Sequence, residues 1–267
     1  MTTKIVILAR GLGTRMRAAA SVGLDAAQSA AADAGLKAMI PIDRPFLDYA
    51  LSSFADAGLR EVCLVVGPEH DAIREYYSRV ATSRLRIAFA IQEKPVGTAD
   101  AVLSARDFVG GDSFLVVNSD NYYPTGVIAA LRRPPAPALP AFSRDGLIRD
   151  GQIPPERISR YALLDIDSAG ALRRIVEKPT DDEAAALGQA AVSMNCWLFD
   201  ERIFEACRRV PKSKRGEHEL PLAVQFAIDH LDMRFRAFHA DAPVLDLSQR
   251  DDIASVAARL RGTRVEL

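Results

Sequence analysis

A glycine-rich turn followed closely by an arginine is the first feature of this sequence that could carry chemistry. Gly11 and Gly13 let the backbone approach a ligand closely, and amide groups at such a turn can cradle phosphate oxygens. Arg15 adds a guanidinium that can bind a phosphate through two parallel hydrogen bonds. Met16 stands where the dinucleotide fingerprint needs a third glycine, and no Gly-Lys-Ser/Thr phosphate loop occurs. The turn is therefore expected to bind phosphate, but it belongs to neither the nicotinamide-binding type nor the Walker type.

Further polar motifs follow this turn in a fixed order along the chain. They are Lys37 in Lys-Ala-Met-Ile-Pro-Ile, Gln92 before Gly97-Thr98-Ala99-Asp100, Asp120 after Phe114–Asn118, Glu177-Lys178-Pro179, Ser193-Met194-Asn195, and Asp246 in Val-Leu-Asp-Leu. Each motif has an ordinary alternative. Asp120 could cap a helix, Asp246 could belong to a turn, Glu177-Lys178 could be a solvated pair, Lys37 could be exposed, and Gln92 could simply end a strand. Only their occurrence together favours one site.

In this order the motifs resemble those of the sugar-1-phosphate nucleotidyltransferase family, over about residues 4–256. The resemblance implies an enzyme that condenses a nucleoside triphosphate with a sugar 1-phosphate, with Mg²⁺ as cofactor and pyrophosphate as second product. It does not fix the base or the sugar, although a hexose 1-phosphate with UTP or dTTP is slightly favoured.

The resemblance also implies a role for each matching residue. Leu8, Ala9, Gly11, Gly13, Thr14, Gln92, Gly97 and Thr98 would bind the nucleotide; Arg15, Lys37 and Lys178 would act in catalysis; Glu177, Lys178, Ser193 and Asn195 would bind the sugar phosphate; Asp120 and Asp246 would bind magnesium. Joining two phosphates requires mostly positioning and charge neutralisation, because the attacking oxygen is already deprotonated. Magnesium prefers carboxylate and phosphate oxygens, and one or two protein carboxylates suffice.

Four features depart from the family pattern, one of them being that Leu247-Ser248 follows Asp246 in place of the common Gly-Thr. Arg10 replaces the usual glycine or alanine beside the base. Lys37 follows Arg15 by 22 positions where about ten are usual, and the extra segment Ala18–Gly35 is alanine-rich enough for a short helix over the site. Asn195 stands where the sugar pocket usually has glycine.

The elements that would hold these residues alternate between strand and helix. Apolar runs at residues 5–9, 61–67 and 114–118 predict buried parallel strands, and helical patterns at 46–57, 71–77 and 98–105 separate them. This predicts an α/β, Rossmann-like, doubly wound, mostly parallel mixed sheet with helices on both faces.

The second half of the chain predicts a hairpin at 161–176, a strand at 192–199 and helices at 219–231 and 251–260. The proline-rich stretch 134–140 predicts a break that cannot pair in a central strand. A single domain over 1–267 is expected, with a nucleotide-binding half at about 1–133 and a sugar-phosphate half at about 141–267.

Composition limits the other classes of function. A net charge of -1 gives no reason to expect nucleic acid or a membrane surface as partner. The three cysteines have no metal or disulfide spacing, the residues before the first strand do not resemble a secretion signal, and a cytoplasmic location is expected. The four histidines are assigned to the surface. The family allows a homo-oligomer.

Two alternative functions remain open at this stage. One is a non-catalytic nucleotide-sugar sensor or regulatory subunit on the same fold, which would not need two metal carboxylates. The other is a metal-dependent glycosyltransferase, because Asp165-Ile166-Asp167 imitates the Asp-x-Asp motif of those enzymes.

Overall fold

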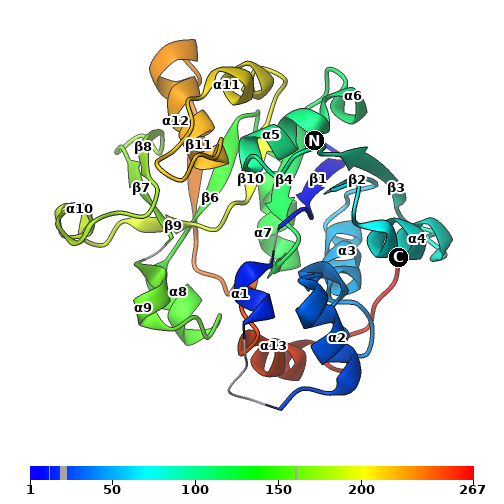
Figure 1. Ribbon diagram of the computed structural model, residues 1–267. Coiled ribbons are helices and arrows are strands. Elements are labelled where there is room, and N and C mark those ends of the chain that lie inside the picture. The colour runs from blue at the N-terminus through cyan, green and yellow to red at the C-terminus, as the bar shows by residue number, and fades with distance from the viewer. Residues whose placement is uncertain (12, 19–22, 160) are drawn as a thin grey trace.

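The computed structural model describes residues 1–11, 13–18, 23–159 and 161–267. Within them, ten strands form one mixed sheet in the order β3-β2-β1-β4-β10-β6-β9-β7-β8, with β11 also paired to β6 (Figure 1). The strands are β1 Lys4–Leu8, β2 Glu61–Val66, β3 Arg86–Ile91, β4 Phe114–Asn118, β6 Ala138–Phe142, β7 Ala162–Ile166, β8 Leu172–Val176, β9 Ala191–Ser193, β10 Trp197–Phe199 and β11 Arg236–Ala240. A second small sheet pairs β5 Asn121–Tyr122 with β12 Leu245–Asp246.

The first half of the sheet is parallel and the second half mostly antiparallel. Strand β1 pairs in parallel with β2 and β4, and β2 pairs in parallel with β3. Strand β10 then runs antiparallel to β4, and β7 and β8 form an antiparallel hairpin. The expected α/β fold with one mixed sheet is confirmed. Because β1, β2, β3 and β4 share a direction, the loops after them lie at one edge of the sheet.

Helices cover both faces of this sheet (Figure 1). The helices are α1 Thr14–Arg17, α2 Ala26–Ala34, η1 Lys37–Met39, α3 Phe46–Asp56, α4 Asp71–Arg79, α5 Thr98–Ser104, α6 Arg106–Val109, α7 Thr125–Leu131, α8 Arg144–Arg149, α9 Pro155–Ile158, α10 Asp181–Leu187, α11 Ile203–Arg209, α12 Leu220–Leu231 and α13 Asp252–Leu260. Ile5 and Ile7 of β1 pack with α3, α4 and α7, whereas Val6 and Leu8 pack with α5, α11 and α12. Residues 5–8 of β1 therefore present apolar side chains to both faces of the sheet in alternation.

The expectation for the proline-rich stretch is wrong at its end. Strand β6 contains Pro140 and pairs with β10 at Ala138, with β9 at Phe142 and with β11 along its whole length. On the side of β6 that faces β10 and β9, the paired residues are Ala138 and Phe142, on either side of Pro140. The missing N–H of Pro140 therefore removes no hydrogen bond on that side. A buried strand can therefore contain this proline.

The strand expected at 192–199 is divided in two. Strands β9 and β10 are separated by Met194–Cys196, and Asn195 has φ 51°. A left-handed residue cannot continue an extended strand, so the chain bends there. Both halves still pair with β6, while β9 also pairs with β7 and β10 also pairs with β4.

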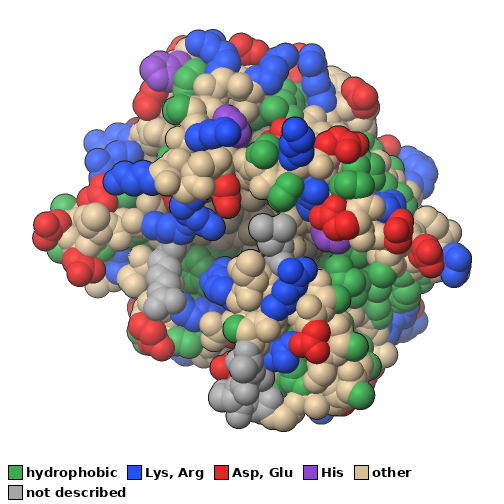
Figure 2. Space-filling model, in the orientation of Figure 1, with side chains coloured by type: hydrophobic (Ala, Val, Ile, Leu, Met, Phe, Trp, Pro, Cys, Tyr) green, Lys and Arg blue, Asp and Glu red, His purple; other side chains and the backbone are tan. Residues whose placement is uncertain are grey.

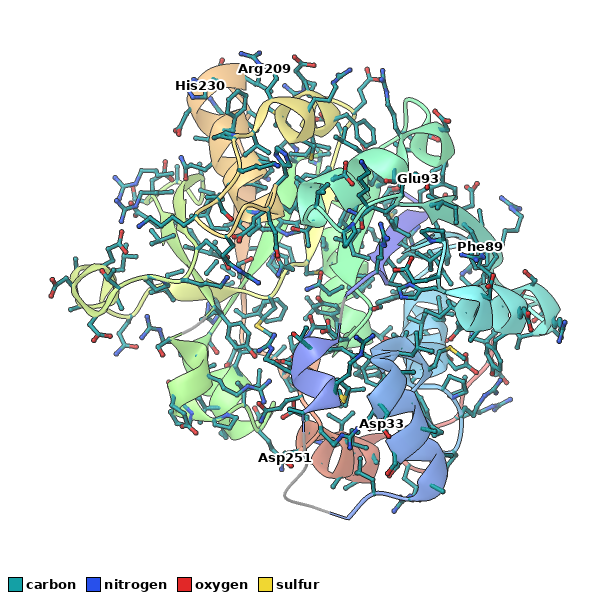
Figure 3. All side chains as sticks on the ribbon, in the orientation of Figure 1. Asp33, Phe89, Glu93, Arg209, His230 and Asp251 are labelled. Carbon is teal, nitrogen blue, oxygen red and sulfur yellow. The ribbon has the colours of Figure 1, made fainter. Side chains whose placement is uncertain are left out.

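The inserted segment contains a helix at residues 26–34, while residues 19–22 of the expected segment lie outside the described part. Asp25 caps α2 by accepting a hydrogen bond from Gln28 N at 2.8 Å, and Gly35 ends it with φ 74°. Ala32 is fully buried with Met16 and Ile40. Asp33 on α2 pairs with Arg250, next to Asp251 at the start of α13 (Figure 3). The helix is thus attached to the body of the protein.

Candidate active site

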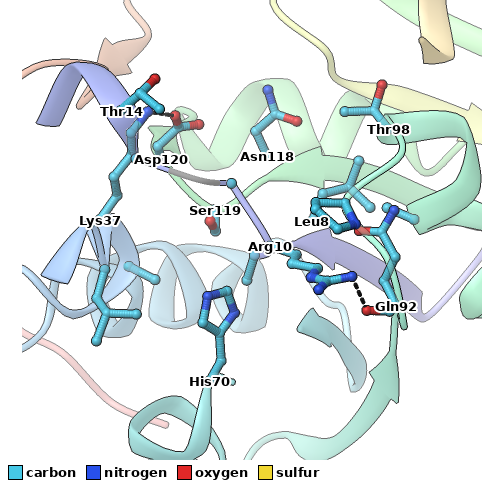
Figure 4. Close-up of a pocket in the computed structure, with 18 of the residues that line it drawn as sticks. Leu8, Arg10, Thr14, Lys37, His70, Gln92, Thr98, Asn118, Ser119 and Asp120 are labelled. Carbon is cyan, nitrogen blue, oxygen red and sulfur yellow. Dashed lines mark hydrogen bonds and ion pairs between the residues drawn. The ribbon is translucent and has the colours of Figure 1, made fainter. Parts of the chain in front are cut away.

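A cavity of about 430 Å³ opens at the carboxyl ends of the parallel strands. Its lining comes from the loops after β1, β2, β3 and β4, from the end of the inserted segment and from the loop before α12 (Figure 4). The face of the molecule in Figure 2 is hollowed near its centre, with Lys and Arg side chains around the hollow. Ligands of open α/β sheets bind at this edge, so the cavity is the candidate active site.

Eleven of the residues predicted from the sequence line this cavity. They are Leu8, Ala9, Gly11, Gly13, Thr14, Arg15, Lys37, Gln92, Gly97, Thr98 and Asp120. Asn118, Ser119 and His70 join them, and His70 corrects the assignment of all four histidines to the surface. Its side chain is 12% exposed, and burial, reinforced by the Arg10 guanidinium, lowers the pKa of His70. At neutral pH this imidazole is therefore uncharged.

The glycine-rich turn after β1 is held against the inserted segment. Gly13 has φ 62°, and a Cβ atom there would lie 2.5 Å from Gly35 O. Both the backbone angle and the contact therefore require glycine at position 13. The close approach places the end of the insertion, which leads directly into Lys37, beside the turn.

Lys37 and Asp120 form an ion pair inside the cavity. Lys37 Nζ lies 2.7 Å from Asp120 Oδ2, and the two side chains are 14% and 21% exposed. Lys37 lies on η1 after the insertion, while Asp120 follows β4. This end of the cavity also has Thr14 and Arg15, so it combines two cations, one carboxylate and the glycine-rich turn. Such a set suits a polyphosphate with a divalent cation.

The opposite end of the cavity is mostly uncharged. Gln92 is 3% exposed, and its Nε2 donates to Gly97 O at 3.0 Å and to Asp100 Oδ2 at 2.9 Å. Thr98 Oγ1 accepts a hydrogen bond from Leu220 N at 2.8 Å and so caps α12 as well as lining the cavity. Between Gln92 after β3 and Asp120 after β4 lie three strand spacings, roughly 14 Å.

Asp246 lies beside Asp120 in the backbone but its carboxylate has other partners. Leu247 N donates to Asp120 O at 2.8 Å, and Asp246 pairs with Asn121 between β12 and β5. Its Oδ1 accepts from Asn121 Nδ2 at 3.1 Å. Its Oδ2 accepts from Tyr161 Oη at 2.5 Å, from Ser248 Oγ at 2.6 Å and from Arg157 Nη2. Burial alone would lower the pKa of Arg157, but its contacts with Asp246, Tyr161 and Asp252 together outweigh burial and the pKa is raised.

These contacts test how a magnesium ion would fit. Asp120 lines the cavity and keeps Oδ1 without a partner among the described residues, which suits a metal ligand. Asp246 has both oxygens engaged, and Arg157 already neutralises it. Among the described residues, no cluster of three or more His, Cys, Asp or Glu side chains could hold a metal by itself. The donor set therefore fits an ion bound by one carboxylate together with substrate oxygens.

The residues expected to bind the sugar phosphate lie outside this cavity. Lys178 has φ 49° and its Nζ is 3.8 Å from Glu177 Oε1. Ser193 Oγ accepts a weak hydrogen bond from Asn195 N at 3.4 Å. Burial and then the Glu219 carboxylate raise the pKa of Glu177, which places Glu177 near the loop before α12. Left-handed backbone at Lys178 and Asn195 marks the strained positions typical of functional sites.

That loop connects the two groups of residues. Arg215 and Glu217 line the cavity, and Arg215 Nη1 lies 3.8 Å from Glu219 Oε1. The cluster of positive charge formed by Lys212, Lys214 and Arg215 is the signal in the sequence that could have indicated this loop. Arg157 and Tyr161 were not predicted, because neither belongs to a motif of the family pattern.

Asp165 and Asp167, which match the Asp-x-Asp motif in sequence, have structural roles in the β7–β8 hairpin. Asp167 Oδ1 accepts hydrogen bonds from Ala169 N and Ala171 N at 2.9 Å and so closes the β7–β8 hairpin. Asp165 pairs with Arg173 at 2.8 Å on the exposed side. Neither carboxylate lines the cavity.

Among the described residues, no helix combines the length and apolar character needed to span a bilayer.

Comparisons with known proteins agree with this arrangement. The family model described as Nucleotidyl transferase matches residues 4–260. A glucose-1-phosphate thymidylyltransferase of Streptomyces griseus is 29% identical over 227 residues, covering 85% of this chain and 57% of the relative. A glucose-1-phosphate thymidylyltransferase of Mycolicibacterium smegmatis is 24% identical over 259 residues, covering 96% of this chain and 81% of the relative. The chain thus spans little more than half of the Streptomyces relative.

Solved structures show the same fold. A UDP-glucose pyrophosphorylase complexed with UDP-glucose superimposes with a TM-score of 0.77 at 18% identity, covering 99% of this chain and all of the other. A UDP-glucose pyrophosphorylase from Acinetobacter baumannii superimposes with a TM-score of 0.76 at 19% identity, covering 99% of this chain and 96% of the other.

Proposed function

Because the chain belongs to the nucleotidyl transferase family, we propose that it transfers a nucleotidyl group from a nucleoside triphosphate to a sugar 1-phosphate. The proposal rests on one observation: the glycine-rich turn, the Lys37–Asp120 pair and Gln92 all line the same cavity. Its two ends differ in charge as the two ends of a nucleotide do. Named relatives that act on glucose 1-phosphate support a sugar 1-phosphate as acceptor.

In this reaction an oxygen of the sugar phosphate attacks the α-phosphorus of the triphosphate. The new P–O bond forms as the bond to the departing pyrophosphate breaks, and no proton has to be removed from the attacking oxygen. Arg15 and Lys37 would hold and neutralise the triphosphate oxygens, while the amides of Gly11 and Gly13 would contact them. Asp120 would hold a magnesium ion, which supplies further charge neutralisation.

The acceptor would approach from the side of Glu177 and Lys178. Lys178 would neutralise the sugar phosphate, and Glu177, Ser193 and Asn195 would contact the sugar hydroxyls. Arg215 reaches the cavity from the loop near Glu177 and would meet the phosphates where donor and acceptor join. Asp246 would act as a magnesium ligand only after releasing Arg157, so its metal role is the least supported of the assigned roles.

A panel of triphosphates crossed with sugar 1-phosphates tests the proposal. Pyrophosphate release with Mg²⁺ present, lost in Asp120→Asn, is the expected result. A sensor of the same fold would bind a nucleotide-sugar without releasing pyrophosphate from any pair. A glycosyltransferase would consume a nucleotide-sugar and release a nucleoside diphosphate. Either of those results would replace the proposal.

A further inference from the structure

The end of the cavity that holds Gln92 also contains Arg10, which stands where the family pattern usually has glycine or alanine. Arg10 follows β1, and its side chain lines the cavity while being only 6% exposed. Its Nε and Nη2 donate to the two carboxylate oxygens of Glu69 at 3.2 Å each, and its Nη1 donates to Gln92 O. Figure 4 shows this side chain extended towards Gln92, on the side of the cavity away from Lys37 and Asp120.

These contacts fix the guanidinium and neutralise it. Glu69 lies in the turn after β2, and Gln92 follows β3, so Arg10 is held by the ends of two strands. Burial would raise the pKa of Glu69, but the hydrogen bonds that it accepts, including that from Arg10, lower it overall. The carboxylate is therefore charged at neutral pH. A guanidinium clamped by a carboxylate is poorly placed to act as a phosphate ligand.

The clamped guanidinium still has donors to offer. A guanidinium has five N–H groups, and these contacts use one on each nitrogen. In the part of the chain that the structure describes, each terminal nitrogen keeps one N–H without a partner. At this end of the cavity, such a donor can meet a carbonyl oxygen of a bound base.

Gln92 offers the complementary acceptor. Its Nε2 is committed to Gly97 O and to Asp100, whose carboxylate can only accept, so the amide orientation is fixed. Its Oε1 has no donor among the described residues. Among the described residues, Trp197 Nε1 is the one fully buried side-chain polar atom without a partner, so Gln92 Oε1 is not fully buried, and Gln92 lines the cavity. The base end therefore presents an acceptor on Gln92 beside a donor on Arg10.

We propose that Arg10, clamped by Glu69, is a specificity residue that selects bases in which a ring N–H lies next to a carbonyl oxygen. Uracil, thymine and guanine have this edge: the N–H donates to Gln92 Oε1 and the carbonyl accepts from Arg10. Cytosine and adenine have a ring nitrogen acceptor next to an amino group. The ring nitrogen would face the acceptor Gln92 Oε1, and the amino group would face the donors of Arg10. The inference rests on the proposed function, because it assumes that a nucleotide fills the cavity.

Equilibrium binding of Mg²⁺-nucleotides without an acceptor tests the inference apart from turnover. UTP and CTP differ only at this edge, and so do ITP and ATP. The wild-type protein should bind UTP at least about tenfold more tightly than CTP, and ITP at least about tenfold more tightly than ATP. Equal or reversed preference in both pairs would overturn the assignment.

Arg10→Ala should reduce both ratios by on the order of tenfold, while binding of inorganic tripolyphosphate stays unchanged. Glu69→Ala, which releases the clamp but keeps the arginine, should reduce them less. Arg79→Ala is the matched control, because Arg79 pairs with Glu75 on the exposed side of α4 and is 80% exposed. Unchanged ratios in Arg10→Ala, or an equal weakening of tripolyphosphate, would show that Arg10 has no role in base selection.

The outcomes also separate this inference from the proposed function. Discrimination in binding without pyrophosphate release for any pair would remove the transferase activity but keep the role of Arg10. Pyrophosphate release with no discrimination between UTP and CTP would keep the transferase activity but remove the role of Arg10. If Arg10→Ala does not fold, Arg10→Lys, which keeps the charge but loses the planar set of donors, gives the same comparison.

Discussion

Lys37 Nζ lies 2.7 Å from Asp120 Oδ2, although the two residues are 83 positions apart in the sequence. Each would meet the phosphates from a different element, Lys37 from the end of the insertion and Asp120 from the end of β4. In the protein without ligand, the pair balances its own charge. Binding of Mg²⁺ to Asp120 would free the lysine for a phosphate oxygen, so both residues would contribute to the proposed step.

Asp120→Asn should lower turnover by at least about a hundredfold, because the carboxylate charge that holds magnesium is lost. The side chain is 21% exposed, so the thermal unfolding midpoint should change little. Steady-state pyrophosphate release and thermal unfolding measure the two effects. Full activity in this variant would remove Asp120 from the site.

Asp246→Asn should have a different signature, with loss of stability as its main effect. Asp246 is 8% exposed and receives Arg157, Tyr161 and Ser248. Removing its charge leaves a buried guanidinium poorly compensated, which costs about 3 kcal/mol of unfolding free energy. Denaturant unfolding measures the loss. Asp150→Asn, at an exposed ion pair with Arg149, is the control and should cause no measurable change.

Replacing both members of the buried pair extends this test. Arg157→Met combined with Asp246→Leu should recover part of the stability that Asp246→Asn loses, because no unpaired charge remains. A double variant as unstable as the sum of its single variants would contradict this explanation.

Gly13→Ala should damage both stability and triphosphate binding. Its φ of 62° disfavours a side chain, and the added Cβ would lie 2.5 Å from Gly35 O. The expected loss is about 2 kcal/mol of unfolding free energy, with weaker triphosphate binding. Gly11→Ala is the control for stability, because a Cβ there meets nothing within 4 Å among the described residues. Equal stability losses in the two variants would contradict the role of the Gly35 contact.

Lys178→Ala and Arg15→Ala should affect opposite substrates. Lys178 is assigned to the acceptor, so its loss should raise the apparent KM for the sugar phosphate more than that for the triphosphate. Arg15 lines the polyphosphate end of the cavity, so its loss should do the reverse. Initial rates with each substrate varied in turn measure both. Equal effects on the two apparent KM values would count against these placements.

The pH dependence of stability should reveal the environment of Glu177. Burial and the nearby Glu219 raise its pKa, so the folded protein binds this proton more readily than the unfolded chain does. Its favourable contribution is complete below the unfolded pKa of about 4.5 and is lost as pH rises through the folded pKa. Glu177→Gln should therefore raise the unfolding midpoint at pH 7 more than at pH 4.

Glu183 provides a control of opposite sign. The hydrogen bond from Thr180 N lowers the pKa of Glu183, so its contribution is present above the unfolded pKa and lost as pH falls. Glu183→Gln should lower the unfolding midpoint at pH 7 and have less effect at low pH. The same sign for both variants would contradict the explanation for Glu177.

The sequence alone determined the features that depend on neighbouring residues. The apolar runs of β1, β2 and β4 and the glycines after β1 predict a parallel sheet with a phosphate-binding turn, because burial on both faces, and the positive φ of Gly13, are local requirements. The order of the motifs indicated the family. The assigned roles of the individual site residues remain predictions.

The tertiary structure decided which charged side chains meet. Arg157 reaches Asp246 across 89 positions, Arg10 reaches Glu69 across 59, and Pro140 fits in β6 because the recorded pairs on one side flank it. None of these contacts follows from a pattern along the chain. Each depends on the order of strands in the sheet, which brings together loops that are distant in sequence. Whether two charged side chains form an ion pair depends on the distance between them and on their burial in the folded protein. The number of residues between them in the sequence gives neither quantity.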